Sequence, residues 1–233
     1  MVITHNEVVK SYMENITYFN DELLTISNRD ELFDISMNMD ESQLRNIDEF
    51  VMFVKACEKT IRHMDEYKTF KAQLYEMGLT RCQIWGNIDM GMEGDGVDIE
   101  MHHGPILTLF DYCAIMIDHL LRNGEMVTTF DVARKVLDEH WEGNVQVVML
   151  SKTVHQLVDT GQIFINFNQA TGNINRFLKK YRDGLNPERI EKINKYIQMS
   201  EQFDSFDNGL LDIKSTITDW NYEVALERMK QPL

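Results

Sequence analysis

The 233-residue sequence predicts a mostly helical α+β fold, and three observations lead to this prediction. Apolar residues recur every three or four positions through the first and last thirds of the chain, which is the spacing of amphipathic helices. The stretch VDIEM at residues 97–101 instead alternates between apolar and acidic side chains, as a strand does. Apolar residues make up 43% of the chain, which is enough to build a core and argues against disorder.

The first third of the chain, residues 1–78, is predicted to be a helical arm. Apolar residues have helical spacing over Glu7–Leu24. From Ile47 to Met77 they repeat near every 3.5 residues, which indicates one long, coiled-coil-like helix of about 45 Å. Such a helix needs an apolar partner, which is either the preceding helices of the same chain or a second copy of the chain in a homodimer.

The middle of the chain, residues 79–182, is predicted to contain a small sheet. Leu79–Asn87 and Val97–Met101 have the pattern of two strands in a β-hairpin, because the glycine- and aspartate-rich stretch between them favours a turn. Ile163–Phe167 alternates again and predicts a closing strand.

Further helices are predicted from apolar spacing and from glycine or proline boundaries, at Leu107–Asn123, Phe130–His140, Lys152–Asp159, Glu188–Gln202 and Asn208–Met229. The first two would form a helical insertion over about residues 106–140. The last two would form a C-terminal helical segment over residues 183–233.

Charge and hydropathy exclude several classes of protein. The net charge of −15 argues against a protein that coats nucleic acid, because such proteins need Lys and Arg to displace counterions from phosphate. Residues 1–78 carry a net charge of −7 and residues 79–182 only −4, so a local DNA site in the middle of the chain stays open. No run of about 18 apolar residues occurs, so we expect no membrane span.

The cysteines and the first residues of the chain indicate a cytoplasmic protein. Cys57, Cys82 and Cys113 are widely spaced and form no CxxC pair, which argues against a disulfide framework and against a zinc site built from cysteine. The opening MVITHNEVVK lacks the pattern of a secretory signal peptide. A reducing cytoplasm, that of the infected host if the protein is phage-encoded, is therefore the expected location.

Side chains that could carry chemistry follow the predicted 97–101 strand. His102 and His103 are adjacent, and neighbours in a strand point to opposite faces, but a turn at the strand end could let both reach one site. His155 and Asp159 are four positions apart and share one face of the predicted helix. One strand-end histidine and this helical pair would give a divalent metal three ligands and leave it open positions.

This order of residues resembles the HNH endonucleases, whose fold is a β-hairpin followed by a helix that holds a metal ion. The shared pattern is a strand ending in His-His, then an Asn, then a helix with His-x-x-x-Asp. The segment from Leu79 to Phe167, with IEMHH and LSKTVHQLVD, also resembles bacteriophage proteins of HNH-like character. The resemblance implies a small ββα-metal core with a helical insertion, flanked by the two helical parts of the chain.

The resemblance also implies a role for each residue of the pattern. His103 is expected to be the general base that activates water for attack on a DNA phosphodiester, and Asn144 is expected to orient it. His102, His155 and Asp159 are expected to hold Mg²⁺, Mn²⁺ or Zn²⁺, which would neutralise charge on the scissile phosphate.

One basic cluster is a candidate for contact with DNA, and it consists of Arg176, Lys179, Lys180 and Arg182. Four basic residues within seven positions could bind phosphates, and the alternative is a solvated helix face that has no phosphate partner.

Two functions remain open from the sequence. The first is a phage-type, metal-dependent endonuclease of DNA. The second is a non-catalytic phage structural, regulatory or host-interaction protein, for example one that counters host defence, built on an HNH-like core without turnover. In the second case the acidic helical arms would bind a host or phage protein.

Overall fold

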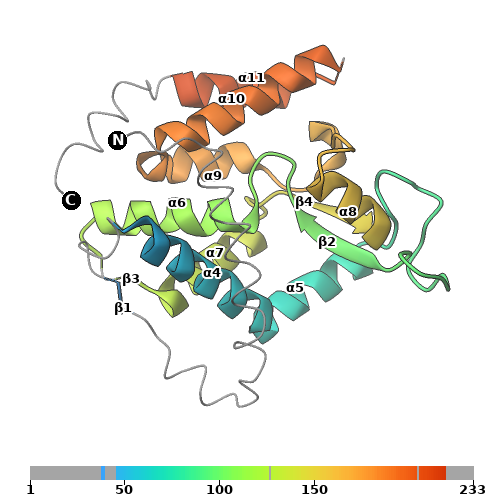
Figure 1. Ribbon diagram of the computed structural model, residues 1–233, viewed down its shortest axis with the longest axis horizontal. Coiled ribbons are helices and arrows are strands. Elements are labelled where there is room, and N and C mark those ends of the chain that lie inside the picture. The colour runs from blue at the N-terminus through green and yellow to red at the C-terminus, as the bar shows by residue number, and fades with distance from the viewer. Residues whose placement is uncertain (1–37, 40–45, 126, 204, 219–233) are drawn as a thin grey trace. The chain divides into compact units, whose positions relative to one another are not determined.

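The computed structural model describes residues 38–39, 46–125, 127–203 and 205–218 (Figure 1). In chain order, the elements of these residues are β1 (Asn38–Met39), α4 (Ile47–His63), α5 (Asp65–Glu76), β2 (Ile99–His103), α6 (Leu109–Arg122), β3 (Val127–Thr128), α7 (Thr129–Trp141), β4 (Val147–Ser151), α8 (Lys152–Asp159), η2 (Phe167–Gln169), α9 (Ile174–Lys180), η3 (Arg182–Gly184), α10 (Pro187–Gln202) and α11 (Asn208–Thr218). This mostly helical α+β architecture agrees with the fold class that the sequence predicts.

Helix α6 lies at the centre of the main core. Its sequence LFDYCAIMIDHLLR is apolar on nearly every side, and a helix of this kind must be enclosed by other elements. Helices α4 and α7 pack against it (Figure 1). Its start is fixed by a capping box, in which the Thr108 hydroxyl accepts from the Asp111 backbone N–H and the Asp111 carboxylate accepts from the Thr108 backbone N–H.

The sheet that positions the candidate site joins β2 to β4. The two strands are antiparallel, with His102 opposite Val148 and His103 opposite Val147, although α6, β3 and α7 separate them in the chain. Helix α8 follows β4 directly and packs against both strands (Figure 1). The order is therefore strand, helical insertion, antiparallel strand and helix.

Strand β4 is buried on both faces, and this divides the apolar interior into two cores. Val147 and Met149 point into the main core around α6. Val148 and Leu150 point to the other face of β4, toward α8. There they form a smaller core with Cys82, Val154 and Ile165. Because successive side chains of a strand alternate between faces, the sheet is the partition between the two cores.

The predicted β-hairpin is wrong in its pairing. Strand β2 pairs with β4, and the Leu79–Asn87 segment forms no strand, only an isolated bridge between Arg81 and Asp89. All five residues of β4 are buried and four of them are apolar, so β4 is the better partner for β2.

The predicted closing strand at Ile163–Phe167 is also absent from the structure. Ile165 is buried in the smaller core and Ile163 packs against it. From α10, the Tyr196 hydroxyl donates a hydrogen bond of 2.8 Å to the backbone carbonyl of Ile165. Phe164 stacks on the ring of Tyr196. The alternation therefore reflects burial of Ile163 and Ile165 in the smaller core, with Phe164 between them on α10, and not pairing with a strand.

The predicted long helix over Ile47–Met77 is two helices, which meet at Met64. The backbone of Met64 is extended, with ψ of 138°, and the residue caps both α4 and α5. The break turns Tyr67 and Phe70 toward the rings of His103 and His140. The apolar repeat continues through the break, which is why the sequence does not reveal it.

The apolar face of α4 finds its partners within the same chain. Phe53, Val54, Cys57 and Ile61 are fully buried in the core that α4 shares with α6 and α7. These four side chains of α4 are therefore covered, within the described residues, by helices that follow α4 in the chain.

The predictions of α6, α7, α8 and α10 are confirmed, with boundaries that differ by no more than about two residues. Asn186 caps α10 through the backbone N–H of Arg189, and Pro187 occupies its first turn. Helix α11 is described as far as Thr218, and the rest of its predicted length lies outside the described residues, as does the helix predicted at Glu7–Leu24. No helix among the described residues is long and apolar enough to span a membrane.

A buried carboxylate ties α7 to α9. Glu139 is 1% exposed and accepts hydrogen bonds from the Lys180 ammonium, the Tyr181 hydroxyl and the Asn144 amide. Burial alone would raise the pKa of Glu139, but these three donors outweigh burial and hold its pKa below the usual value.

We expect Tyr181→Phe to destabilise the fold by about 2 kcal/mol at pH 7, because it removes a hydrogen bond to a buried charge. The contribution of Glu139 is present above its unfolded pKa of about 4.3 and is lost as the pH falls through the lower folded pKa. The variant should therefore lose less stability than the wild type between pH 6 and pH 3.

Urea unfolding at a series of pH values measures both effects. Tyr75→Phe is the matched control, since the Tyr75 hydroxyl donates only a long bond of 3.4 Å to the carbonyl of Ile99. Equal losses of stability at pH 7 in the two variants would contradict the importance of the Glu139 network.

Candidate metal centre

Three side chains that the sequence proposes as metal ligands lie together in the structure. His102 comes from β2, and His155 and Asp159 come from one face of α8. One possible ligand atom from each residue lies within 4.8 Å of those of the other two. The pairing of β2 with β4 brings His102 under α8, which follows β4.

Hydrogen bonding fixes the tautomer of His155. Its Nδ1 lies 2.7 Å from a carboxylate oxygen of Glu100, and a carboxylate accepts, so Nδ1 carries the proton. The lone pair is then on Nε2, which is 3.7 Å from Asp159 Oδ2. A carboxylate that orients a histidine in this way is the common outer partner of a metal-bound imidazole.

His102 presents its Nδ1 toward the same point, 3.9 Å from Asp159 Oδ1. The rings of His102 and His155 meet edge to face, with centroids 4.8 Å apart. Burial, and then the nearby His155, lower the pKa of His102 to about 4, so its imidazole is neutral at neutral pH and keeps a lone pair.

Gly104 makes room for the ring of His102. A Cβ at Gly104 would lie 2.9 Å from His102 Nε2, which is closer than real Cβ atoms approach. Any other residue at this position would push the imidazole from its place beside α8.

The donor set fits a divalent transition metal. Two imidazole nitrogens and one carboxylate oxygen suit Zn²⁺ or a similar ion. Ligand atoms about 2.0–2.2 Å from a tetrahedral ion stand about 3.3–3.5 Å apart, which is closer than the 4.8 Å within which one possible ligand atom from each of the three residues lies here. The Asp159 side chain is 60% exposed at the end of α8, so its carboxylate has room to move toward the two imidazoles.

His103 lies on the opposite face of β2, inside the main core. It is 5% exposed, and its Nε2 is 2.9 Å from His140 Nε2. His140 Nδ1 faces the carbonyl of Val136 at 2.7 Å and therefore carries a proton, so His140 Nε2 accepts and His103 Nε2 donates. The strand alternation thus holds through His103, and the two neighbouring histidines do not face one site.

Asn144 is also separate from the three converging ligands. It is buried in the loop before β4, where its amide donates to Glu139 and Glu142. None of the hydrogen bonds in the described part of the chain joins it to His103 or to the ligands.

The four basic residues proposed for DNA contact do not act as one free patch. Lys180 is paired with Glu139 and Glu142, so its charge is neutralised. Arg182 lies in the turn η3 beyond α9 and is partly buried. Arg176 and Lys179 are exposed on α9.

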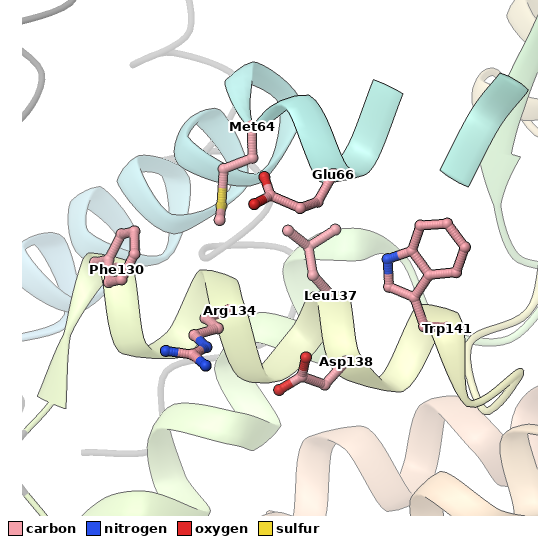
Figure 2. A pocket seen from close by; sticks show the side chains of 7 residues that line it. All are labelled: Met64, Glu66, Phe130, Arg134, Leu137, Asp138 and Trp141. Atoms are coloured by element: carbon pink, nitrogen blue, oxygen red, sulfur yellow. The ribbon is translucent and has the colours of Figure 1, made fainter. Parts of the chain in front are cut away.

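The described residues also enclose two grooves. The first lies between the start of α5 and α7, and Figure 2 shows its side chains, Met64, Glu66, Phe130, Arg134, Leu137, Asp138 and Trp141. The second has a volume of about 250 Å³ and lies between α10, the end of α8 and the residues that follow β2. Only the second is lined by one of the candidate ligands, His102.

Two contributors to this centre are not among the residues proposed from the sequence. Glu100 is two positions before His102, so the same alternation that separates His102 from His103 would have placed it on the ligand side. Gly104 has no such signal, because its importance depends on how closely the imidazole approaches its backbone.

A scan against protein families matches residues 2–224 to one family model, described as the bacteriophage G278-like virion protein. The searches of curated proteins and of solved structures gave no match. Since the family model covers nearly the whole sequence, the chain belongs to the bacteriophage G278-like virion protein family.

Proposed function

We propose that this chain is a non-catalytic component of the phage particle whose β2–β4–α8 unit binds one divalent metal ion. The observation that carries the proposal is the convergence of His102, His155 and Asp159, with His155 oriented by Glu100. Membership of a virion protein family supports a role in the particle. The ion would join β2 to α8 and stabilise the smaller core.

The surroundings of the three ligands favour a structural role over turnover. A general base must reach the water that it activates, and His103 instead donates to His140 in the main core. Asn144 belongs to the Glu139 network. The strong negative charge of the chain suits contacts with neighbouring proteins of the particle, after synthesis in the cytoplasm of the infected cell.

We expect the protein to bind one equivalent of Zn²⁺, and His155→Gln to weaken this binding by more than about 100-fold, because it removes a ligand and not only an outer partner. Isothermal titration with Zn²⁺, Mn²⁺ and Mg²⁺ measures the binding and ranks the metals. His63→Gln is the control, since His63 is exposed on α4 and its ring bonds to the carbonyl of Lys59. Equal zinc affinity in both variants would exclude the proposed ligand set.

Glu100→Gln tests the outer partner separately from the ligands. We expect zinc affinity to fall by about 10- to 100-fold, because Gln holds the imidazole of His155 less firmly and makes it a weaker base. Glu93→Gln removes an equal charge at an exposed position of the loop before β2 and should leave the affinity unchanged. An unchanged affinity in Glu100→Gln would show that the Glu100–His155 contact does not support a metal.

A metal-dependent endonuclease is the second candidate function. Its supporting observation is that three ligands leave open coordination positions on an ion, and that Asp159 is exposed to solvent at that point. In this case the metal itself would lower the pKa of a bound water and supply the nucleophile.

Incubation of supercoiled plasmid with the protein and Mn²⁺, Mg²⁺ or Zn²⁺ separates the two candidates. The non-catalytic proposal predicts no nicking above the level given by Asp159→Asn. Cleavage by the wild type that Asp159→Asn abolishes would establish the endonuclease. Under that outcome, His103→Gln, checked for folding by circular dichroism, would tell whether His103 is the base.

A further inference from the structure

The groove beside His102 combines an apolar wall with positive charge. Ile106, Val158 and Phe164 contribute apolar surface, and α10 contributes Lys192 and Lys195 from the turns that face the groove. Its volume of about 250 Å³ suits a ligand of small-molecule size.

The two lysines of the groove differ in their partners. Lys192 forms an ion pair with Asp111, which is nearly buried at the start of α6, so its charge is neutralised. Lys195 is exposed at the groove and forms no ion pair or hydrogen bond with the described residues. Among the described residues that line the groove, Lys195 therefore contributes about one positive charge that no ion pair neutralises.

His102 also lines the groove and can add a hydrogen-bond donor to it. Its Nδ1 faces Asp159, and its Nε2 lies against Gly104, next to Pro105, which lines the groove. Nε2 makes no hydrogen bond within the described part of the chain. When Nδ1 binds a metal ion, Nε2 must carry the proton and can donate it to an acceptor.

We propose that this groove is a binding site for a small carboxylate with an apolar chain. The apolar part would lie on Ile106, Val158 and Phe164, and the carboxylate would bind the ammonium of Lys195 and the Nε2–H of His102. The Lys195 contact does not require a metal ion; the strengthening of the His102 contact rests on the metal site proposed above.

The groove between α5 and α7 gives a useful contrast. Figure 2 shows Glu66 and Asp138 at its edges together with Arg134, so acidic groups outnumber basic ones. A carboxylate would be repelled there, although four of the seven lining side chains are apolar or aromatic. The anion preference therefore belongs to the groove beside His102.

Hexanoate and 1-hexanol are suitable probes, because they share a chain length and differ in charge. Titrations of the full-length protein with each, followed by ligand-observed NMR, should be made with EDTA and then with one equivalent of Zn²⁺. Lys195→Gln removes the proposed contact, and Lys179→Gln is the matched control, since Lys179 is exposed on α9 away from the groove.

We expect the wild type to bind hexanoate more tightly than hexanol. Lys195→Gln should lower the affinity for hexanoate by about fivefold, which is the effect expected from losing one partly exposed charged hydrogen bond. Hexanol binding should be the same in wild type and Lys195→Gln, and Lys179→Gln should change neither. Equal affinities for the two probes, or hexanoate binding that is insensitive to Lys195→Gln, would overturn the proposal.

The zinc arm separates this proposal from the metal site. If Zn²⁺ binds as proposed, it should strengthen hexanoate binding about twofold or more, because it fixes the proton on His102 Nε2. If Zn²⁺ does not bind, a Lys195-dependent preference for hexanoate would support the groove while the metal proposal fails. If Zn²⁺ binds and the probes do not differ, the groove proposal fails and the metal site stands.

Discussion

The pairing of β2 with β4 is the contact on which the rest of the structure depends. Five residues on each strand divide the interior into a main core around α6 and a smaller core beneath α8. Because side chains alternate across a strand, the pairing sends His103 into the first core and His102 toward the second. It also sets where α8 begins, and so where His155 and Asp159 stand.

Much of the fold could be predicted because local signals agree with the tertiary structure. Thr108, Thr128 and Asn186 are capping residues, and each comes immediately before a helix whose apolar face packs on the core. The strand pairing was mispredicted because turn signals favour a partner close in sequence, whereas burial selected β4. The break at Met64 is not visible in the apolar repeat, because the apolar residues keep the same spacing before and after it.

The site was predictable to the extent that it depends on spacing. Positions four apart on α8 share a face whatever surrounds them, so His155 and Asp159 follow from the sequence alone. The separation of His103 from His102 depends on the strand remaining regular to its last residue, which only the pairing with Val147 ensures. The partners of Asn144 and Lys180 could not be foreseen, because Glu139 reaches them across the fold.

The distance along the chain between the two halves of the candidate metal centre has a consequence for folding. Glu100 and His155 touch although they lie 55 positions apart, and α6 and α7 fill the interval. An ion held by His102 and α8 would close this long loop much as a disulfide does. It would reduce the conformational entropy of the unfolded chain only if it also stayed bound to the unfolded chain. Bound only to the native state, it would stabilise by mass action, so the supply of metal would decide how firmly α8 stays joined to β2.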